Sequence, residues 1–416
     1  MVEVPHILLI NYPKMPTSTD NPPIMGVIHA EVIPSTIDLT STLAKPGKEQ
    51  SMNQNIIHLP QSMQAVMCYG PRDYRLVEVS VPQVGAGEVL IRVLGAGICA
   101  GDAKCFTGAP LFWGDADRPG YCQPPVIPGH EFVGEVVALG AGAADKYGLT
   151  LGDWATSEQI VPCWECRFCK RGQYWMCDKK HDVYGFRQRT FGAMADYMLF
   201  PADAINHKVP KTLAARHAVY IEPLACAIHA VQRGEIELGD TVVISGCGPL
   251  GLGMVAAARL KGPGLLIALD RKPSRLAVAR KAGADLVLNP DEVDVVAEVR
   301  KLTDGYGCDV YIEATGHPTS VTQGLHMIRR LGTFVEFSVF GEPTTVDWTI
   351  IGDTKELNIH GAHLGPFCYP LAIDMLVKGQ VPVDDIVTDV VPLAQFDAAF
   401  DLVFKSQNSI KIMLQP

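Results

Sequence analysis

The order of hydrophobic and polar residues divides the chain into a weakly patterned start and two patterned regions. Residues 1–62 contain only short apolar stretches, without a sustained period of two or 3.6, and we expect a poorly ordered extension there. From Met63 onward, short alternating stretches such as residues 88–93 are separated by Gly and Pro. Short strands of this kind predict an all-β domain of the barrel type over residues 63–218.

From Asp240 onward, β-branched stretches alternate with helical patterns. The first stretch spans residues 241–245, and a helical pattern follows it at residues 252–260. Further strands are expected at residues 265–269, 286–288, 308–313 and 333–339. This alternation predicts an α/β domain with a doubly wound parallel sheet, which we assign to residues 219–357.

Composition favours a protein of two domains that acts on a small molecule. The 416 residues are 48% hydrophobic and 19% charged, so the chain can bury a large core. A net charge of −10, without basic runs, argues against a nucleic-acid partner. No apolar stretch reaches the ~18 residues of a membrane span. The cysteine pattern indicates metal binding in a reducing compartment, so we expect a cytoplasmic protein.

The strongest local motif is a group of four cysteines with the spacing C-x2-C-x2-C-x7-C, inside a predicted lobe of residues 160–180: Cys163, Cys166, Cys169 and Cys177. Four closely spaced thiolates suit a tetrahedral zinc ion with no position left for substrate. An iron–sulfur cluster is the alternative for such a motif. We therefore expect a structural metal, with zinc favoured.

A second candidate metal site combines Cys99, which follows the strand at residues 88–93, with the adjacent pair His130 and Glu131. A thiolate, an imidazole and a carboxylate are all ligands of zinc, and three protein ligands leave a position open for chemistry. The nearby loop residues Phe112 and Trp113 either form the floor of a substrate pocket or anchor the loop. Glu222 stands at the start of a predicted helix, where a carboxylate can simply stabilise the helix terminus.

A glycine-rich loop follows the strand at residues 241–245 and opens the next helix: Gly246, Gly248, Pro249, Leu250 and Gly251. With a strand before it and a helix after it, this G-x-G-x-x-G motif predicts a dinucleotide site. Asp270 ends the second strand and can accept hydrogen bonds from the adenosine ribose, which favours NAD over NADP. Arg271 directly after it weakens that preference.

Together, these motifs make residues 63–416 resemble the zinc-dependent medium-chain dehydrogenases of the sorbitol and threonine dehydrogenase branch. The resemblance implies a GroES-like barrel with a four-cysteine zinc lobe, a Rossmann domain, and residues 358–416 returning to the first domain. It also implies two zinc ions per chain and a homo-oligomer, either a dimer or a tetramer. Further similarities, including those at residues 164–166 and 361–366, are with erythritol and L-threitol dehydrogenases.

The resemblance also implies roles for single residues. Cys99, His130 and Glu131 match the ligands of the catalytic zinc. Glu222 matches an acid beside the metal-bound water that can exchange in as a ligand. The positions that match cofactor-binding residues are Leu250, Asp270 and Arg275. The implied reaction is oxidation of a secondary alcohol of a small polyol to a ketose by hydride transfer to NAD, with sorbitol, xylitol and L-threonine as alternative substrates.

Three positions depart from the family pattern. Gly101 stands where relatives carry a hydroxyl and Lys104 where they carry a histidine, so the usual proton path is interrupted. The proton must instead leave through water, the cofactor ribose, Glu222, or Lys104 if its pKa is depressed. Leu364 replaces an arginine near the substrate. The alternatives are a zinc-free reductase of the same fold and a non-catalytic protein that binds zinc and nucleotide.

Overall fold

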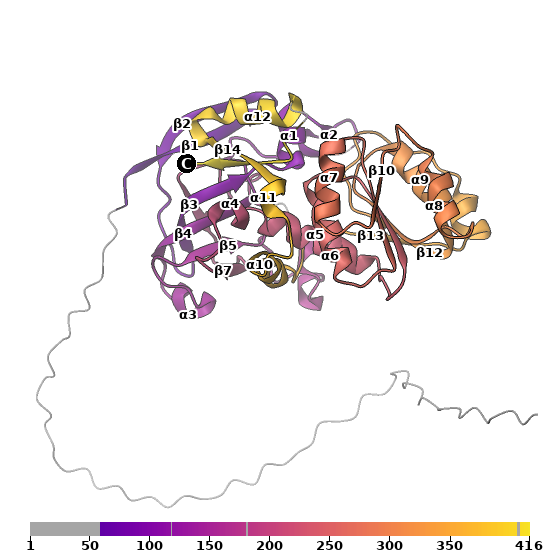
Figure 1. The fold of residues 1–416 in the computed structure, drawn as a ribbon. Coiled ribbons are helices and arrows are strands. Elements are labelled where there is room, and N and C mark those ends of the chain that lie inside the picture. Colours follow the sequence, from indigo (N-terminus) through magenta and orange to yellow (C-terminus); the bar gives the residue numbers. More distant parts are fainter. Residues whose placement is uncertain (1–58, 118, 180–181, 406–407) are drawn as a thin grey trace, which may run out of the picture. The chain divides into compact units, whose positions relative to one another are not determined.

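A computed structural model describes residues 59–416 apart from 118, 180–181 and 406–407 (Figure 1). The predicted extension over residues 1–62 lies outside the described residues except for its last few positions, so that prediction stays untested. None of the helices within the described ranges is long and apolar enough to cross a membrane.

The β-barrel type of domain predicted from residue 63 is confirmed, although short helices lie between its strands. Its described strands form a hairpin of β1 with β2 and a seven-stranded sheet in the order β14-β15-β3-β4-β5-β7, where β6 pairs with β3 (Figure 1). The bounds of these strands are β1 Ser62–Gly70, β2 Asp73–Ser80, β3 Val89–Gly97, β4 Glu131–Leu139, β5 Trp154–Ser157, β6 Tyr197–Phe200, β7 Asn206–Val209, β14 Val387–Pro392 and β15 Lys411–Gln415. This is the GroES-like barrel expected from the sequence.

The parallel sheet predicted from Asp240 is also confirmed. The described strands follow the order β10-β9-β8-β11-β12-β13, and every pair is parallel. Counted along the domain this is the 3-2-1-4-5-6 order of dinucleotide-binding sheets. The bounds are β8 Thr241–Ser245, β9 Leu265–Leu269, β10 Leu286–Leu288, β11 Cys308–Glu313, β12 Ile328–Glu336 and β13 Asn358–Gly361.

The alternation of side chains along β8 explains why this sheet is covered on both faces. Val242 and Ile244 enter one hydrophobic core, whereas Val243 enters the core on the opposite face. The sequence of a strand that is buried on both faces is therefore a continuous run of apolar residues. The predicted strand at residues 333–339 is shifted, because β12 begins at Ile328 and ends at Glu336.

Helices connect the strands and fill both faces of the parallel sheet. Those of the nucleotide-binding domain and its borders are α5 Ile221–Arg233, α6 Pro249–Arg259, α7 Pro273–Lys281, α8 Val295–Leu302, α9 Pro318–Met327 and α10 Tyr369–Val377. Three of them, α6, α7 and α9, begin with proline, whose fixed φ and missing N–H suit the first helical position. The remaining segments are α1 Ala100–Thr107, α2 Pro110–Trp113, α3 Ala143–Tyr147, α4 Ala215–Ala218, α11 Val383–Ile386, α12 Phe396–Lys405, η1 Cys169–Arg171, η2 Tyr174–Met176, η3 Ile350–Thr354 and η4 Leu393–Gln395.

The last part of the chain contributes to both sheets. β15 pairs antiparallel with β3, so the C-terminus lies in the barrel domain, with Met413 opposite Gly97. β13, however, pairs with β12, which places Ile359 opposite Phe334 in the parallel sheet. The parallel sheet therefore extends beyond the predicted 219–357 range as far as Gly361.

Candidate active site

The three predicted ligands of the second metal site converge at one end of the barrel sheet. Cys99 is the N-cap residue of α1, and Glu131 is the first residue of β4. The register of β3 with β4 sets Glu131 opposite Gly97, two residues before Cys99. The ligand atoms of Cys99, His130 and Glu131 all lie within 4.8 Å of one another. A Cβ on Gly97 would lie 2.2 Å from Glu131 Oε2, so only glycine leaves room for this carboxylate.

Asp102, which was not among the predicted site residues, orients two of these residues. Its Oδ2 accepts a hydrogen bond of 2.9 Å from the backbone N–H of Cys99. Its Oδ1 lies 3.5 Å from Nδ1 of His130, an electrostatic contact that leaves Nε2 of the imidazole for a metal ion. The spacing of three residues along α1, where Asp102 completes a capping box, is the signal that identifies it.

Lys411 is a second residue that sequence reasoning missed. Its side chain is 2% exposed, its ammonium forms an ion pair with Glu131, and it donates a 3.1 Å hydrogen bond to the carbonyl of Ile98. Burial works against its charge, but Glu131 and Cys99 outweigh burial and raise the pKa of Lys411. No local pattern marks this residue, because it reaches the site only through the pairing of β15 with β3.

The donor set suits a divalent metal ion of the zinc type. A thiol, an imidazole and a carboxylate supply sulfur, nitrogen and oxygen ligands. A tetrahedral zinc ion with three protein ligands keeps its fourth position for water or substrate. The site is also electronegative. Burial disfavours a charged His130, yet Asp102 and Cys99 outweigh burial and raise the pKa of His130 well above its usual value. An environment that stabilises one cation in this way favours another at the centre of the ligands.

Glu222 lies in the first turn of α5 and is buried, but it is not one of the three clustered ligands. Its Oε1 accepts hydrogen bonds from Gln159 Nε2 at 2.6 Å and from the Cys226 thiol at 3.2 Å. Burial raises the pKa of Glu222 to about 7, while His130 acts in the opposite direction and Glu131 adds to the rise. A carboxyl group with such a pKa can gain or lose a proton near neutrality.

Lys104 connects the two domains next to the ligand cluster. It lies on α1, and its ammonium donates to the backbone carbonyl of Val339, which follows β12. Burial lowers the pKa of Lys104, whereas the nearby Cys99 and Glu313 favour its charge. A Cβ at Gly101 would be in ordinary van der Waals contact, 3.6 Å from Cys99 Sγ and 3.7 Å from the Phe112 ring.

Two aromatic rings border the cluster of candidate ligands. The rings of Phe112 and Phe186 stack with centroids 5.2 Å apart, and Phe186 in turn faces His130 at 5.6 Å. Trp113 instead anchors its loop, because its indole N–H donates a 2.7 Å hydrogen bond to the carbonyl of Cys105. Of the two aromatic residues considered for the pocket floor, Phe112 is therefore the one at the site.

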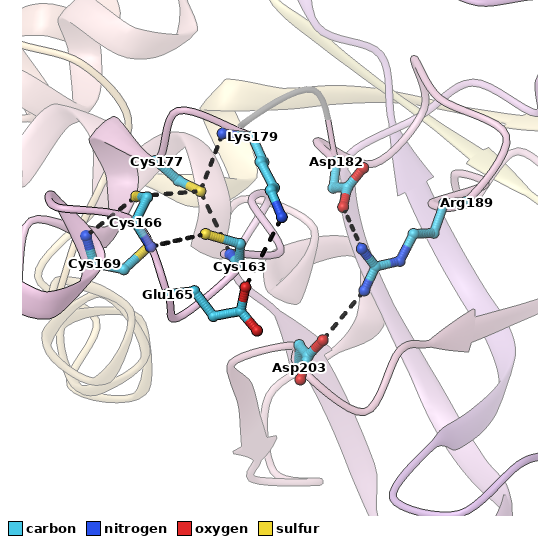
Figure 2. Close-up of polar contacts among 9 residues, drawn as sticks. All are labelled: Cys163, Glu165, Cys166, Cys169, Cys177, Lys179, Asp182, Arg189 and Asp203. Carbon is cyan, nitrogen blue, oxygen red and sulfur yellow. Dashed lines mark hydrogen bonds and ion pairs between the residues drawn. The ribbon is translucent and has the colours of Figure 1, made fainter.

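The four cysteines of the lobe gather into one site (Figure 2). Their sulfur atoms lie within 4.8 Å of one another, and backbone N–H groups point at them, as from Cys166 to Cys163 at 3.3 Å. The N–H groups of Cys169 and Asp178 lower the pKa of the Cys166 thiol to about 6. Figure 2 also shows Lys179 paired with Glu165 at 3.9 Å beside the lobe. All twelve cysteines are free thiols, so the lobe is suited to hold a metal ion.

The glycine-rich loop has the geometry of a dinucleotide cradle. Gly246 has φ +102°, and a Cβ there would lie 2.8 Å from the carbonyl of Ala314. A Cβ on Gly251 would lie 1.7 Å from the carbonyl of Gly246, so strand and helix approach closely only with glycine. Around Gly248 the space is open, and no side chain caps α6 at this residue. Backbone N–H groups at this helix terminus are therefore available to a pyrophosphate.

Asp270 and its neighbours form the edge of this cradle. The carboxylate accepts 2.8 Å hydrogen bonds from the backbone N–H groups of Cys247 and Lys272. Arg275 lies 3.8 Å from it, on the side of the glycine-rich loop. Arg271 points elsewhere, because its guanidinium pairs with Asp291 at 2.7 Å. The predicted cofactor residues thus surround one end of the parallel sheet.

Fold and site together define a dehydrogenase of the zinc-binding type with a separate nucleotide-binding domain. Residues 85–211 match the alcohol dehydrogenase GroES-like domain family, and residues 249–378 match the zinc-binding dehydrogenase family. The chain belongs to the zinc-dependent medium-chain dehydrogenases, in the branch that holds sorbitol and threonine dehydrogenases.

Several relatives support this membership. An erythritol/L-threitol dehydrogenase from Mycolicibacterium smegmatis is 55% identical over 358 residues, covering 86% of this chain and 99% of that protein. A sorbitol dehydrogenase from Bacillus subtilis is 32% identical over 364 residues, covering 86% and 98%. The crystal structure of a zinc-binding dehydrogenase from Sinorhizobium meliloti, bound to NADP, has a TM-score of 0.76 at 28% identity and covers 86% of this chain and 100% of that one.

Replacing Gly246 with alanine should destabilise the protein by about 1–3 kcal/mol, because alanine is strained at this positive φ and its Cβ meets the Ala314 carbonyl. Thermal unfolding followed by circular dichroism measures the change. Gly248→Ala is the matched control. Its Cβ has no neighbour nearer than the 4.0 Å to Arg275, so the only expected loss of stability is the small cost of alanine at an N-cap, below about 1 kcal/mol, while dinucleotide binding weakens. Equal losses of stability in both variants would contradict the strain argument.

Glu336 should make stability depend on pH. It stands opposite the buried Glu313 on the neighbouring strand, and burial together with the Glu313 charge raises its pKa to about 7. Below the unfolded-state pKa of about 4.5, this raised pKa does not change the free energy of unfolding. As pH rises toward 7, ionisation of the buried carboxyl lowers that free energy by a growing amount. Glu336→Gln should therefore match the parent near pH 5 and exceed it by about 1 kcal/mol at pH 8, after solvent screening. Thermal melts at the two pH values test this, and a constant difference would refute it.

Proposed function

We propose that this dehydrogenase uses zinc and NAD to oxidise a secondary alcohol of a small polyol, of the erythritol or threitol type, to a ketose. The observation that carries the proposal is the cluster of Cys99, His130 and Glu131 beside a buried Glu222 whose pKa is about 7. The substrate class is supported by the 55% identity to the erythritol/L-threitol dehydrogenase.

In this proposal Cys99, His130 and Glu131 hold the catalytic zinc. When bound, zinc acidifies the hydroxyl of the substrate, and NAD accepts the hydride from the carbinol carbon. Glu222 accepts the proton that the hydroxyl loses. Phe112 and Phe186 exclude water beside His130, and Lys411 neutralises part of the charge on Glu131.

The cysteine lobe supports the proposal of a second, structural zinc ion. Four thiols fill all positions of a tetrahedral ion, so substrate has no access to it. A zinc-free reductase would need neither this lobe nor the cluster at Cys99. The predicted count of two zinc ions per chain can be checked by metal analysis of the purified protein.

NAD is favoured over NADP by the contacts of Asp270. Its carboxylate stands where a 2′-phosphate would bring a second negative charge. Arg271, which could bind that phosphate, is engaged by Asp291. The related structure bound to NADP shows that the fold accepts a 2′-phosphate, so local residues must set the preference. A homo-oligomer and a cytoplasmic location stay predictions.

The first test is NAD reduction by the purified protein with four- to six-carbon polyols and L-threonine. We expect activity that is highest with erythritol or threitol and is lost with a chelator. Glu222→Gln should lower kcat by ~100-fold or more, because a missing proton acceptor costs 10²–10⁴-fold, while zinc content stays unchanged.

The conservative variant Asp145→Asn, on the exposed part of α3, serves as a control and should keep full activity. Inactivity on the whole panel in the zinc-loaded protein would favour the non-catalytic binding protein. Equal activity of Glu222→Gln and the parent would remove Glu222 from the mechanism.

Cofactor preference gives a second test. Asp270→Ser should lower the ratio of kcat/KM for NAD over NADP by about 10–100-fold, since each 1.4 kcal/mol is a factor of ten. Adding Asp291→Ala releases Arg271 and should shift the ratio a further few-fold, as expected for an exposed ion pair worth about 0–1 kcal/mol. Asp291→Ala alone is the matched control with a small shift. A ratio that Asp270→Ser leaves unchanged would contradict the assignment of Asp270.

A further inference from the structure

A buried glutamine lies directly behind Glu222. Gln159 follows β5 and precedes the cysteine lobe, and its side chain is 2% exposed. Its Nε2 donates the 2.6 Å hydrogen bond to Glu222 Oε1 and also lies 3.2 Å from the Cys226 sulfur. A buried amide must satisfy its donors and its acceptor, so the partner of its oxygen decides how it is oriented.

Tyr369 fixes that orientation. The hydroxyl of Tyr369, at the start of α10, donates a 2.9 Å hydrogen bond to Gln159 Oε1. The same hydroxyl accepts a 3.1 Å hydrogen bond from the backbone N–H of Gln159. The Tyr369 ring is fully buried and stacks on His207 with centroids 5.3 Å apart. With its oxygen engaged by Tyr369, the amide can present only its NH₂ group to the carboxylate of Glu222.

Glu158, the residue before Gln159, connects the segment after β5 to the cysteine lobe. Glu158 accepts a 2.6 Å hydrogen bond from the hydroxyl of Tyr174, which lies on η2 between two of the lobe cysteines. Glu158 also lies 3.2 Å from Nε2 of His207. The backbone at Gln159 is therefore fixed from the lobe on one side and from α10 on the other.

The arrangement acts on only one oxygen of Glu222. The hydrogen bonds from Gln159 and from Cys226 both end on Oε1. Oε2 takes part in neither bond, so it is the oxygen that can serve a proton or a ligand. Without these two bonds, the carboxylate in the first turn of α5 would be free to rotate.

We propose that Gln159 is a positioning residue that holds Glu222 beside the metal ligands in one orientation, with Tyr369 fixing the amide. Only the predicted loss of kcat rests on the proposed function. The orientation itself is a property of the buried hydrogen bonds, and it can be measured without substrate.

The experiment combines Gln159→Leu with Glu222→Gln in the full-length, zinc-loaded protein. We expect Gln159→Leu alone to lower kcat by about 10–100-fold, the usual cost of losing an outer contact at a metal site, with KM changed by less than about threefold. In the Glu222→Gln background the same substitution should change kcat by less than about twofold, because its target is gone. Equal losses in both backgrounds, or no loss in either, would overturn the proposal.

A spectroscopic measurement separates this inference from the proposed function. In protein loaded with cobalt(II), Gln159→Leu should shift the visible absorption bands, because Glu222 becomes able to turn toward the ligands. Ser157→Ala is the matched control. It removes a buried hydroxyl two residues away that bonds to the carbonyl of Ile205, and its bands should equal those of the parent.

Turnover and the cobalt(II) absorption spectrum test the two proposals separately. A parent without turnover but with a shifted spectrum in Gln159→Leu would overturn the polyol reaction and support the positioning role. Unshifted bands in Gln159→Leu would overturn the positioning role whether or not the parent turns over. If Gln159→Leu does not fold, Tyr369→Phe replaces it, since loss of the hydroxyl frees the amide while the ring keeps its stacking on His207. It must shift the bands in the same direction.

Discussion

The site depends on the register of three neighbouring strand ends. β3 sets Gly97 opposite Glu131 of β4, and β15 sets Met413 opposite the same Gly97. Because side chains alternate along a strand, a shift of one residue would turn Glu131 to the other face of the sheet. The pairing therefore decides which charged groups share the site, and it brings Lys411 from the end of the chain next to ligands near its start.

This convergence creates a balance of charge that a metal ion completes. Glu131 is buried, and a buried carboxylate without a partner is strongly unfavourable. Lys411 supplies one positive charge to it. Metal binding to Cys99 requires its thiolate, which would add a negative charge that Lys411 cannot also neutralise. The remaining negative charge supports a divalent ion at the centre of Cys99, His130 and Glu131.

The sequence predicted the elements that local patterns determine. The strands β8 to β11 were expected at the residues where they occur, because each is a short β-branched or apolar run followed by a helical pattern. The four-cysteine motif and the glycine-rich loop were recognisable from spacing, whereas Cys99, His130 and Glu131 were predicted as a second metal site from their residue types. The start of β12 was not, since Ile328 follows α9 directly and Leu331, with φ +59°, interrupts the run before Thr333.

Contacts between distant segments could not be predicted. Lys411 contacts the site through Glu131, which lies hundreds of residues away in the sequence. Gln159 contacts it through Glu222, which lies tens of residues away. Neither residue belongs to a motif, and a lysine or glutamine at such positions is ordinarily exposed. Only the packing of β15 on β3 and of α10 against the segment after β5 reveals that both side chains are buried and directed at carboxylates of the candidate site.

These contacts bear on the proton path that Gly101 and Lys104 leave open. An ammonium group has three donors and no acceptor, and that of Lys104 already donates to the Val339 carbonyl. To take a proton it would first have to lose one. Burial eases that loss by lowering the pKa of Lys104, whereas the nearby Cys99 and Glu313 oppose it. Glu222 has the opposite properties, with a pKa of about 7 and an oxygen outside the bonds from Gln159 and Cys226. Glu222 is therefore better suited than Lys104 to be the first proton acceptor. Lys104 instead connects the two domains beside the site.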